Sequence, residues 1–463
     1  MILPPVLKEI SKEIERVGGR VVVVGGSVRD FFLGTKSKDF DIEVFGLNSL
    51  DDLQNILSNF GKVANVGKSF GVLKIKIQEN EFDFSFPREE TKVSKGHKGF
   101  RIKSDGFMDY KSAAKRRDFT INSMGYDLLE DKILDPYGGR DDLKAKLLRH
   151  IDDKTFIEDP LRVYRAVQFC ARFELTMHPK TKKLCKEMVK SGVLQELPKE
   201  RVYEEFKKLL LKSTKPSIGF ELLKELGILK YFPQLNDLIG TKQDRVWHPE
   251  GDVWIHTMMV IDEMAKLKKG DEKEQLVLMF GALCHDFGKP GTTKYEDGRI
   301  RSKGHEQAGV KPTEEFLKLL TDDKQIVDEV VPLVANHLAP FQLYDAKSSN
   351  KAIRRLSLRV NIDKLLLVAL ADFLGRDCEE AKSGKSEAIE WIKEKAIDLK
   401  VQNNPPKPLV LGRDLIDLGL KPSPMFKKIL DEMYSKQLDG EFGNKEEALK
   451  KLPDVLKTFD IRI

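Results

Sequence analysis

The hydrophobic pattern of this 463-residue chain changes once along its length, near Glu158. Before that point, apolar residues form β-branched runs or alternate with polar ones, which is typical of strands, over residues 20–24, 40–45, 72–77 and 82–86. A helix is expected around Val28 to Leu33, between the first two strands. After Glu158 the apolar residues recur at helical spacing to the end of the chain. The pattern therefore predicts a small α/β head followed by a long all-helical body.

Three polar or proline-containing stretches divide the helical part, and they lie at residues 212–217, 240–251 and 403–408. No internal repeat or low-complexity tract is present. We therefore expect four parts, namely a head over 1–150, a helical neck over 151–240, a helical body over 241–402 and a helical tail over 403–463.

Composition excludes some classes of protein. No apolar run approaches the roughly 18 residues of a membrane-spanning helix, and the N-terminus has no uninterrupted apolar segment of a secretory signal. The four cysteines are far apart in the sequence, so neither a disulfide framework nor a thiolate zinc site is expected. These features favour a cytoplasmic protein without a membrane partner. The net charge of +6 is mild, and it fits either a well-solvated surface or a polyanionic partner.

Two aspartates stand two residues apart in the strand segment KDFDIEVFG. Side chains two apart on a strand point to the same face, so Asp39 and Asp41 project together. Such a pair is tolerated when a hard cation such as Mg²⁺ binds it, and Asp83 would add a third carboxylate from a neighbouring strand. Two Mg²⁺ ions would support in-line phosphoryl transfer. Taken alone, this pattern also fits a solvated edge strand.

The residues before this strand favour the catalytic interpretation. Gly25 and Gly26 directly follow a buried-looking strand and lead through a tight turn into a helix that carries Arg29. Backbone N–H groups at such a turn suit a triphosphate. A pair of glycines is weak evidence alone, but GGSVRDFFLG followed by KDFDIEVFG is far more specific.

These motifs resemble the class II CCA tRNA nucleotidyltransferases and bacterial poly(A) polymerases of the DNA polymerase beta superfamily. Three further segments are similar to that family's later motifs in the same order, and a fourth, Glu200 to Glu205, is similar to its fifth motif. The three are RRDFTINSM at 116–124, LDPYGG at 134–139 and EDPLR at 158–162. One departure is Ser123, where the family usually has alanine. The resemblance implies an α+β fold, with a mixed-sheet nucleotidyltransferase head and an elongated all-helical neck, body and tail.

The resemblance also implies the roles of individual residues. Asp39, Asp41 and Asp83 would be catalytic, with Asp39 and Asp41 holding two Mg²⁺ ions. The implied nucleotide-binding residues are Gly25, Gly26, Arg29, Arg116, Arg117, Asp118, Glu158, Asp159, Arg162 and Arg165. Asp159 and Arg162 would share one helix face, where the carboxylate accepts from an exocyclic amine and the guanidinium donates to the ring beside it. CTP and ATP carry that amine and UTP does not, although the segment alone also fits an ordinary helix cap.

A basic stretch over residues 88–103 lies between the first two motifs and is expected to be a mobile loop. In the resembled family a loop at this place is associated with the terminal A addition, and enzymes that add only CC lack part of it. Its presence favours full CCA addition, although a surface loop with scattered lysines would have the same composition.

A second group of polar residues lies in the helical body, in the order His, His-Asp, His, His, Asp. It resembles the HD-superfamily phosphohydrolases, and the setting HPEGDVWIHTMMV resembles the body of enterobacterial-type CCA enzymes. The implied ligands of a divalent metal are His256, His285, Asp286 and Asp372, with His305 and His337 as further metal or phosphate contacts. Phosphatase and 2′,3′-cyclic phosphodiesterase activity would follow. The other histidines, assigned structural roles, are His97, His150, His178 and His248.

The sequence thus predicts a template-independent enzyme that adds C, C and A to the tRNA 3′ end from CTP and ATP, with release of pyrophosphate. Three alternatives stay open. One is a poly(A) polymerase on the same scaffold, and another is an enzyme that adds only CC or only A. The third is an HD phosphohydrolase or RNA-binding protein with an inactive head, which the two head carboxylates disfavour.

Overall fold

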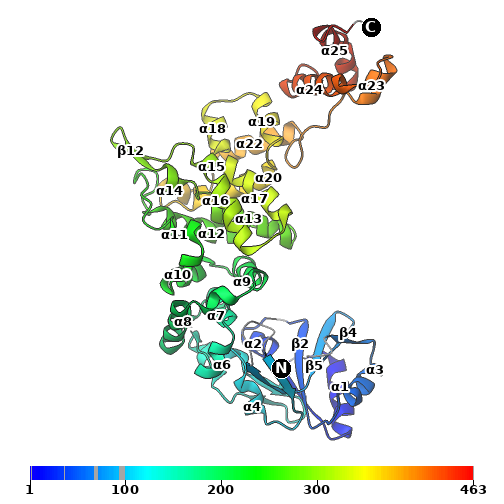
Figure 1. The fold of residues 1–463 in the computed structure, drawn as a ribbon, viewed down its shortest axis with the longest axis vertical. Helices are drawn as coiled ribbons and strands as arrows, with labels where there is room; N and C mark the ends of the chain where they lie inside the picture. Colours follow the sequence, from blue (N-terminus) through cyan, green and yellow to red (C-terminus); the bar gives the residue numbers. More distant parts are fainter. Residues whose placement is uncertain (2, 36, 67–70, 93–99, 462–463) are drawn as a thin grey trace. The chain divides into compact units, whose positions relative to one another are not determined.

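The computed structural model describes residues 1, 3–35, 37–66, 71–92 and 100–461 (Figure 1). They form two compact units, Met1–Ile228 and Leu229–Ile463. The first unit contains a seven-stranded sheet and the helices that follow it, and the second unit is mostly helical. The mixed-sheet head and the helical remainder confirm the predicted α+β class.

The sheet of the first unit has the strand order β3-β4-β5-β2-β1-β8-β9. Strands β2 and β5 are parallel, and the other neighbours are antiparallel. The four valines of β1 are buried, as expected for a central strand covered on both faces. The bounds are β1 Arg20–Val24, β2 Asp39–Phe45, β3 Val63–Val66, β4 Val72–Ile77, β5 Asn80–Ser85, β8 Gly125–Asp127 and β9 Lys132–Leu134.

Short helices cover this sheet and connect its strands. Helix α1 buries Leu7, Ile10 and Ile14, an i, i+3, i+7 stripe, and it packs against β1 and α3. Helix α2 follows β1 directly and is therefore held beside the centre of the sheet (Figure 1). The bounds are α1 Pro5–Arg16, α2 Gly26–Phe32, α3 Leu50–Ser58, α4 Tyr110–Lys115, η1 Thr120–Asn122 and α5 Gly139–Lys144.

Five helices complete the first unit, and α7 packs against α9 and α10. Helix α7 buries nine of its 13 residues, so it forms the centre of this helical part. The bounds are α6 Asp153–Glu158, α7 Leu161–Phe173, α8 Pro179–Ser191, α9 Lys199–Lys212 and α10 Ser217–Glu225, with the short elements β10 Leu147–Leu148, β11 Thr176–Met177 and η2 Val193–Glu196.

The second unit begins with the 3₁₀ turn η3 (Ile228–Tyr231), which spans the boundary. Buried apolar residues of α12, α13, α17 and α20, which pack on one another, form its central core. The helix bounds are α11 Pro233–Asn236, α12 Val253–Leu267, α13 Glu272–Cys284, α14 Lys289–Thr292, α15 His305–Ala308, α16 Val310–Leu320, α17 Lys324–Asn336, α18 Ala339–Asp345, α19 Asn350–Ser357, α20 Ile362–Leu374, α21 Glu379–Lys382 and α22 Glu387–Asp398.

The last three helices, α23 (Gly412–Asp417), α24 (Pro424–Asp439) and α25 (Lys445–Thr458), have a small core of their own around Leu415, Ile429 and Leu452. Helix α24 also packs on α19. The structure places the predicted chain breaks between helices, with α9 ending at Lys212 and α10 beginning at Ser217.

The expectation of purely helical structure after Glu158 is wrong at the two-residue strand β11, which pairs with β10, and at one hairpin. Strands β12 (Lys294–Glu296) and β13 (Arg299–Arg301) pair antiparallel across Asp297 and Gly298. Both turn residues have positive φ, 51° and 76°, as a two-residue type I′ turn requires. The Asp-Gly pair was the sequence signal for this hairpin.

The basic stretch expected as a loop contains strands β6 (Arg88–Lys92) and β7 (Phe100–Ser104), which pair antiparallel. Residues 93–99, and with them His97, lie outside the described residues. In the part of the chain that the structure describes, no helix combines the length and the apolar character needed to cross a bilayer. The four cysteines are free, and three of them are buried.

Candidate active sites

Three carboxylates meet on one face of the head sheet. Asp39 and Asp41 lie two residues apart on β2, so their side chains point to the same face. Asp41 is the register partner of Asp83 on the parallel strand β5. Burial raises the pKa of Asp41, and the charge of Asp83 adds to this rise, whereas Arg117 and Lys74 oppose it. The Lys74 ammonium lies 2.8 Å from Asp83 Oδ2. The carboxylates repel one another, and the Lys74 ammonium already lies beside one of them. Their oxygen atoms form a ligand set that fits Mg²⁺.

Gly25 holds the turn between β1 and α2 close to these carboxylates. Its φ is 73°, a conformation that favours glycine. A Cβ atom at this position would lie 3.0 Å from Arg117 Nη1 and 3.7 Å from Asp41 Oδ2. The absence of a side chain therefore lets the backbone approach both the carboxylate and the arginine.

Glu43, on the same face of β2, is a residue to which the sequence analysis gave no role. It is 1% exposed, and its Oε1 accepts hydrogen bonds from Nη2 of both Arg116 and Arg117 at 2.9 Å. Burial alone would raise the pKa of Glu43, but the two guanidinium groups hold it below its ordinary value. Glu43 thus fixes two predicted triphosphate-binding arginines next to Asp41.

Asp118 joins the head to helix α7. Its Oδ2 accepts from Arg165 Nε at 2.7 Å, and its Oδ1 accepts from Asn122 Nδ2 at 2.9 Å. Arg29 Nη1 in turn donates to Asn122 Oδ1 at 2.6 Å, and its guanidinium stacks 4.5 Å from the ring centre of Phe173. Arg29 is itself buried, so its predicted contact with the triphosphate stays a prediction.

The expectation that Asp159 and Arg162 share a helix is wrong in one respect. Asp159 has extended φ and ψ of −115° and 100° and lies between α6 and α7, because Pro160 disfavours a helical residue before it. Arg162 is in α7, where Nη1 donates to the Thr155 carbonyl and Nη2 to the Arg116 carbonyl. Arg201 of α9 donates to Asp159 Oδ2 at 3.2 Å.

Most of the predicted nucleotide-binding residues line one cavity of about 510 Å³ in the first unit. Its wall includes Asp41 and five residues without a predicted role. Glu158, Asp39 and Asp83 are not among the residues that form it. The wall consists of Gly25, Gly26, Arg29, Asp41, Arg88, Arg116, Arg117, Asp118, Asn122, Asp159, Leu161, Arg162, Arg165, Phe169 and Arg201. The cavity is strongly basic, with carboxylates at defined places, as a nucleoside triphosphate requires.

Imidazoles and carboxylates gather at a second site, in the other unit. His256, His285 and Asp372 have ligand atoms within 4.8 Å of one another, and so do Asp286, His305 and His337. All six are buried. The residues come from α12, the end of α13, α15, the end of α17 and α20. The structure thus brings together all six residues that the sequence proposed for this site.

Three of these histidines share one hydrogen-bond pattern. Nδ1 of His285, His305 and His337 lies 2.8, 2.7 and 2.7 Å from the backbone carbonyls of residues 282, 302 and 334. Because a carbonyl only accepts, each Nδ1 must carry the proton, which leaves Nε2 as a lone-pair donor to a metal.

The inward-facing atoms of this site need a cation. Nε2 of His305 lies 3.2 Å from Nε2 of His337, and both atoms are acceptors in the tautomers just derived. Nε2 of His285 and Oδ1 of Asp286 are buried without a hydrogen-bond partner, and the other oxygen of Asp286, Oδ2, forms an ion pair with Lys289 Nζ at 2.7 Å. A divalent metal would satisfy these atoms together, so the residues fit one.

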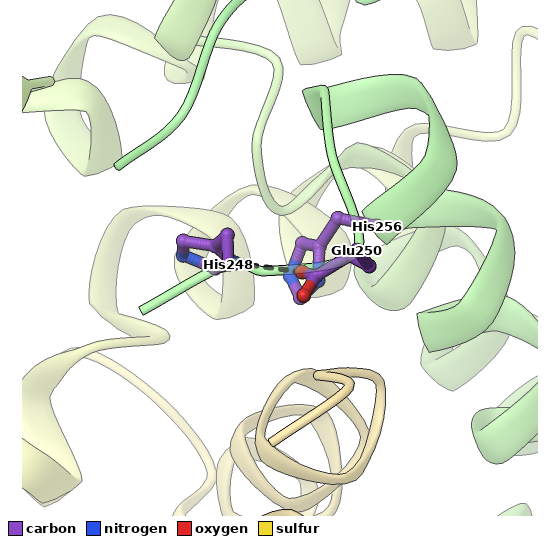
Figure 2. A group of neighbouring side chains, drawn as sticks. All are labelled: His248, Glu250 and His256. Carbon is purple, nitrogen blue, oxygen red and sulfur yellow. Dashed lines mark hydrogen bonds and ion pairs between the residues drawn. The ribbon is translucent and has the colours of Figure 1, made fainter. Parts of the chain in front are cut away.

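His248, to which the sequence analysis assigned a structural role, lies beside this site. Figure 2 shows His248, Glu250 and His256 as neighbours. Glu250 Oε1 is 2.9 Å from Nδ1 of both histidines. Burial would raise the pKa of Glu250, but these two histidines hold it well below its ordinary value. Glu250 fixes the proton of His256 on Nδ1, so that Nε2 faces Asp372 at 3.1 Å.

The other two histidines take part in local contacts of the first unit. His150 Nδ1 lies 2.7 Å from Thr181 Oγ1, and His178 caps the N-terminus of α8.

A mixed sheet with paired carboxylates beside a basic cavity, together with a body of buried histidines and aspartates, defines a nucleotidyltransferase joined to an HD-type domain. Comparison with known families agrees. Residues 21–149 match the poly A polymerase head domain, 174–239 match the probable RNA and SrmB-binding site of polymerase A, and 253–377 match the HD domain.

Two curated relatives carry the name multifunctional CCA protein. The protein of Pasteurella multocida is 34% identical over 394 residues, which cover 83% of this chain and 91% of the relative. The protein of Neisseria meningitidis serogroup B is 37% identical over 328 residues, or 70% and 74% of the two chains. The chain belongs to the multifunctional CCA protein family, which confirms the family predicted from the motifs.

Solved structures share the fold. The CCA-adding enzyme of Bacillus stearothermophilus in complex with CTP superposes with a TM-score of 0.69 at 21% identity, covering 99% of each chain. The Thermotoga maritima CCA-adding enzyme complexed with tRNA gives a TM-score of 0.61 at 20% identity, covering 99% of this chain and 96% of the other.

Proposed function

We propose that the protein adds C, C and A to the 3′ end of tRNA from CTP and ATP. The observation that carries this proposal is the cavity of the first unit. Asp41, Asp159 and Arg162 line this cavity together with several other arginines. Its volume of about 510 Å³ suits one nucleotide at a time. The sequence kinship with multifunctional CCA proteins supports tRNA as the acceptor.

Asp39 and Asp41, with Asp83, would hold two Mg²⁺ ions, which neutralise the charge that develops when the tRNA 3′-oxygen displaces pyrophosphate from the α-phosphate. Arg117, held by Glu43 and close to Gly25, lies where a triphosphate at the β1–α2 turn would need a cation. Its guanidinium is fixed before the nucleotide binds, so little reorganisation is required at the chemical step.

Base selection rests on two groups that neighbouring residues hold in place. Arg201 positions the Asp159 carboxylate, which accepts the exocyclic amine of cytosine or adenine. Two backbone carbonyls position the Arg162 guanidinium, which still has N–H groups to donate to the base. UTP presents an oxygen to Asp159 in place of the amine, and the repulsion between the two acceptors excludes it.

The test supplies purified protein with tRNA that ends at the discriminator base, and with each labelled nucleotide alone and in combination. Growth by three nucleotides with CTP plus ATP supports CCA addition. An unbounded A ladder would instead identify a poly(A) polymerase, and a stop after two C residues a CC-adding enzyme. Asp39→Ala and Asp41→Ala should abolish incorporation, whereas Asp52→Ala, an exposed aspartate on α3, should leave it unchanged.

We further propose a metal-dependent phosphohydrolase in the second unit. The two buried triads and their uniform Nδ1 protonation support it. A divalent metal held there would supply an activated water for hydrolysis of phosphomonoesters and of 2′,3′-cyclic phosphates at RNA ends. Asp286→Ala should abolish phosphate release and spare CCA addition. Unchanged hydrolysis in this variant would contradict the assignment.

A further inference from the structure

The Arg29 guanidinium is fixed at the wall of the nucleotide cavity and keeps N–H groups for a ligand. It is 4% exposed and lies against the β1–α2 turn, since a Cβ atom at Gly26 would be 3.5 Å from its Nη2. Nε and Nη2 donate to Asp30 Oδ1 at 2.9 and 2.7 Å, and Nη1 donates to Asn122 Oδ1 at 2.6 Å. These contacts with described residues use three of the five N–H groups of the arginine, which leaves one on each Nη atom.

Two aromatic rings of α7 support this guanidinium. The Arg29 Cζ atom lies 4.5 Å from the ring centre of Phe173 and 5.4 Å from that of Phe169. The two rings stack on each other, with their centres 5.9 Å apart and 13° between their planes. Arg165, Phe169 and Phe173 are four residues apart, so they share one face of α7, and Arg165 Cζ lies 5.2 Å from the Phe169 ring centre. This face of α7 therefore contacts two arginines of the cavity through its rings.

The surroundings of Phe173 are charged, unlike those of an ordinary core residue. Phe173 is the last residue of α7 and is only half-buried. A second guanidinium, that of Arg172, has its Cζ atom 4.7 Å from the same ring centre. Burial and the charge of Arg29 lower the pKa of Arg172, which shows that the two cations repel each other. Because an aromatic face attracts a cation, the ring offsets part of this repulsion and keeps Arg29 at the turn.

We propose that Phe173 is a positioning residue for the nucleoside triphosphate. Its ring holds the Arg29 guanidinium at the β1–α2 turn, where the two remaining N–H groups donate to the outer phosphates. Phe173 is not among the residues that line the cavity, so it acts through Arg29. A side chain that is ordered in advance binds its ligand more tightly, because it loses less conformational freedom on binding. The inference rests on the proposed nucleotide addition and adds a residue to its machinery.

The test measures the dissociation constants of CTP and ATP by calorimetry, without tRNA, for the full-length protein and three variants. Phe173→Leu keeps an apolar side chain and removes the ring, so both constants should rise by the same factor, about three- to tenfold. Phe173→Tyr keeps the ring and should bind as the wild type does. Phe32→Leu is the matched control. Phe32 is also half-buried beside an arginine, with Arg140 Cζ 5.1 Å from its ring centre, but it does not line the nucleotide cavity.

A second set of measurements separates positioning from support of the fold. Every nucleoside triphosphate carries the outer phosphates, so Phe173→Leu should leave the preference for CTP over UTP unchanged in kcat/KM on tRNA. The affinity for CMP, which lacks these phosphates, should stay within about twofold of the wild type. A loss of folded protein would lower the calorimetric stoichiometry and leave the affinity of the folded fraction unchanged.

Three results would each overturn the inference. They are wild-type affinity for CTP in Phe173→Leu, an equal loss of affinity for CMP, and a Phe173→Tyr variant that binds as weakly as Phe173→Leu. A wild type that binds CTP and ATP but adds no nucleotide to tRNA would instead remove the proposed function. The calorimetric comparison would still test Phe173 in that case, so the two failures are distinguishable.

Discussion

The ion pair between Asp118 and Arg165 joins the sheet-containing part of the first unit to helix α7, and we predict that Asp118→Asn destabilises this unit. Asp118 is 7% exposed, and its two oxygens accept from Phe119 N, Asn122 Nδ2 and Arg165 Nε at 2.7–2.9 Å. Asparagine would keep one acceptor oxygen and turn an NH₂ group toward the guanidinium. The variant therefore loses the charge and creates a contact between two donors.

The size of the effect follows from the burial of the pair. Removing one partner of a buried ion pair costs about 3–5 kcal/mol. Arg165 is 31% exposed and also lies 4.0 Å from Glu205, so part of its charge stays compensated and a loss of about 2–4 kcal/mol is expected. For a unit of 228 residues this corresponds to a fall in Tm of about 5–15 °C.

Thermal unfolding of wild type and variant measures this loss, with Glu187→Gln as the control. Glu187 is 59% exposed and 3.9 Å from Lys183, so its loss should cost at most about 0.5 kcal/mol. In the double-mutant cycle with Arg165→Met, the coupling should be about 2 kcal/mol. A shift in Tm below about 2 °C for Asp118→Asn would refute the reasoning.

The sign of the pH dependence is also fixed. Burial alone would raise the pKa of Asp118, but Arg165, Asn122 and Arg162 hold it below its ordinary value of 3.8. The ion pair therefore stabilises the folded state fully above that ordinary value, and the stabilisation is lost as the pH falls through the lower folded-state pKa. The difference in stability between wild type and Asp118→Asn should be constant near neutral pH and should shrink only under strongly acidic conditions.

Two further variants test residues that hold others in place. Glu250→Gln should lower metal affinity at the second site about 10- to 100-fold without unfolding the chain, because an amide holds the His256 proton on Nδ1 less strongly than a carboxylate. Equilibrium dialysis with Mn²⁺ measures the affinity, and an unchanged value would contradict the prediction. Arg201→Ala should remove one of the two contacts that hold the Asp159 carboxylate, leaving the hydrogen bond from Leu161 N, and should reduce the preference for CTP over UTP about tenfold. The measurement is kcat/KM for each nucleotide on tRNA, and a uniform fall for both nucleotides would show that Arg201 only supports the fold.

The strands of the head were predictable because their side chains follow simple rules of alternation. The segments expected at 20–24 and 72–77 are the observed β1 and β4, and the valine run of β1 occupies the centre of the sheet. The parallel pairing that puts Asp83 opposite Asp41 is a long-range choice of register, and local pattern does not determine it. The three carboxylates could be proposed from sequence, but their common face depends on this pairing.

The residues that sequence reasoning missed hold other functional side chains in position. Glu43 continues the alternation of Asp39 and Asp41, and this position on the same face was a usable signal. Arg201 lies 42 positions from Asp159, so only the packing of α7 on α9 brings them together. The spacing of Asp159 and Arg162 alone predicts one helix face, but Pro160 disfavours a helical residue before it.

The second site shows most clearly what a sequence cannot specify. The histidines of this site can be identified in the sequence, but their capacity to bind a metal depends on which ring nitrogen carries the proton. That choice is made by backbone carbonyls at residues 282, 302 and 334, each three positions before its histidine at a helix end or turn. The same local geometry recurs three times, so each Nε2 lone pair turns inward. His256 differs, because its Nδ1 lies 2.9 Å from the Glu250 carboxylate as well as 3.3 Å from the backbone carbonyl of Gly375, which is far away in the sequence. A change at Glu250 should therefore alter metal affinity while His256 itself stays in place.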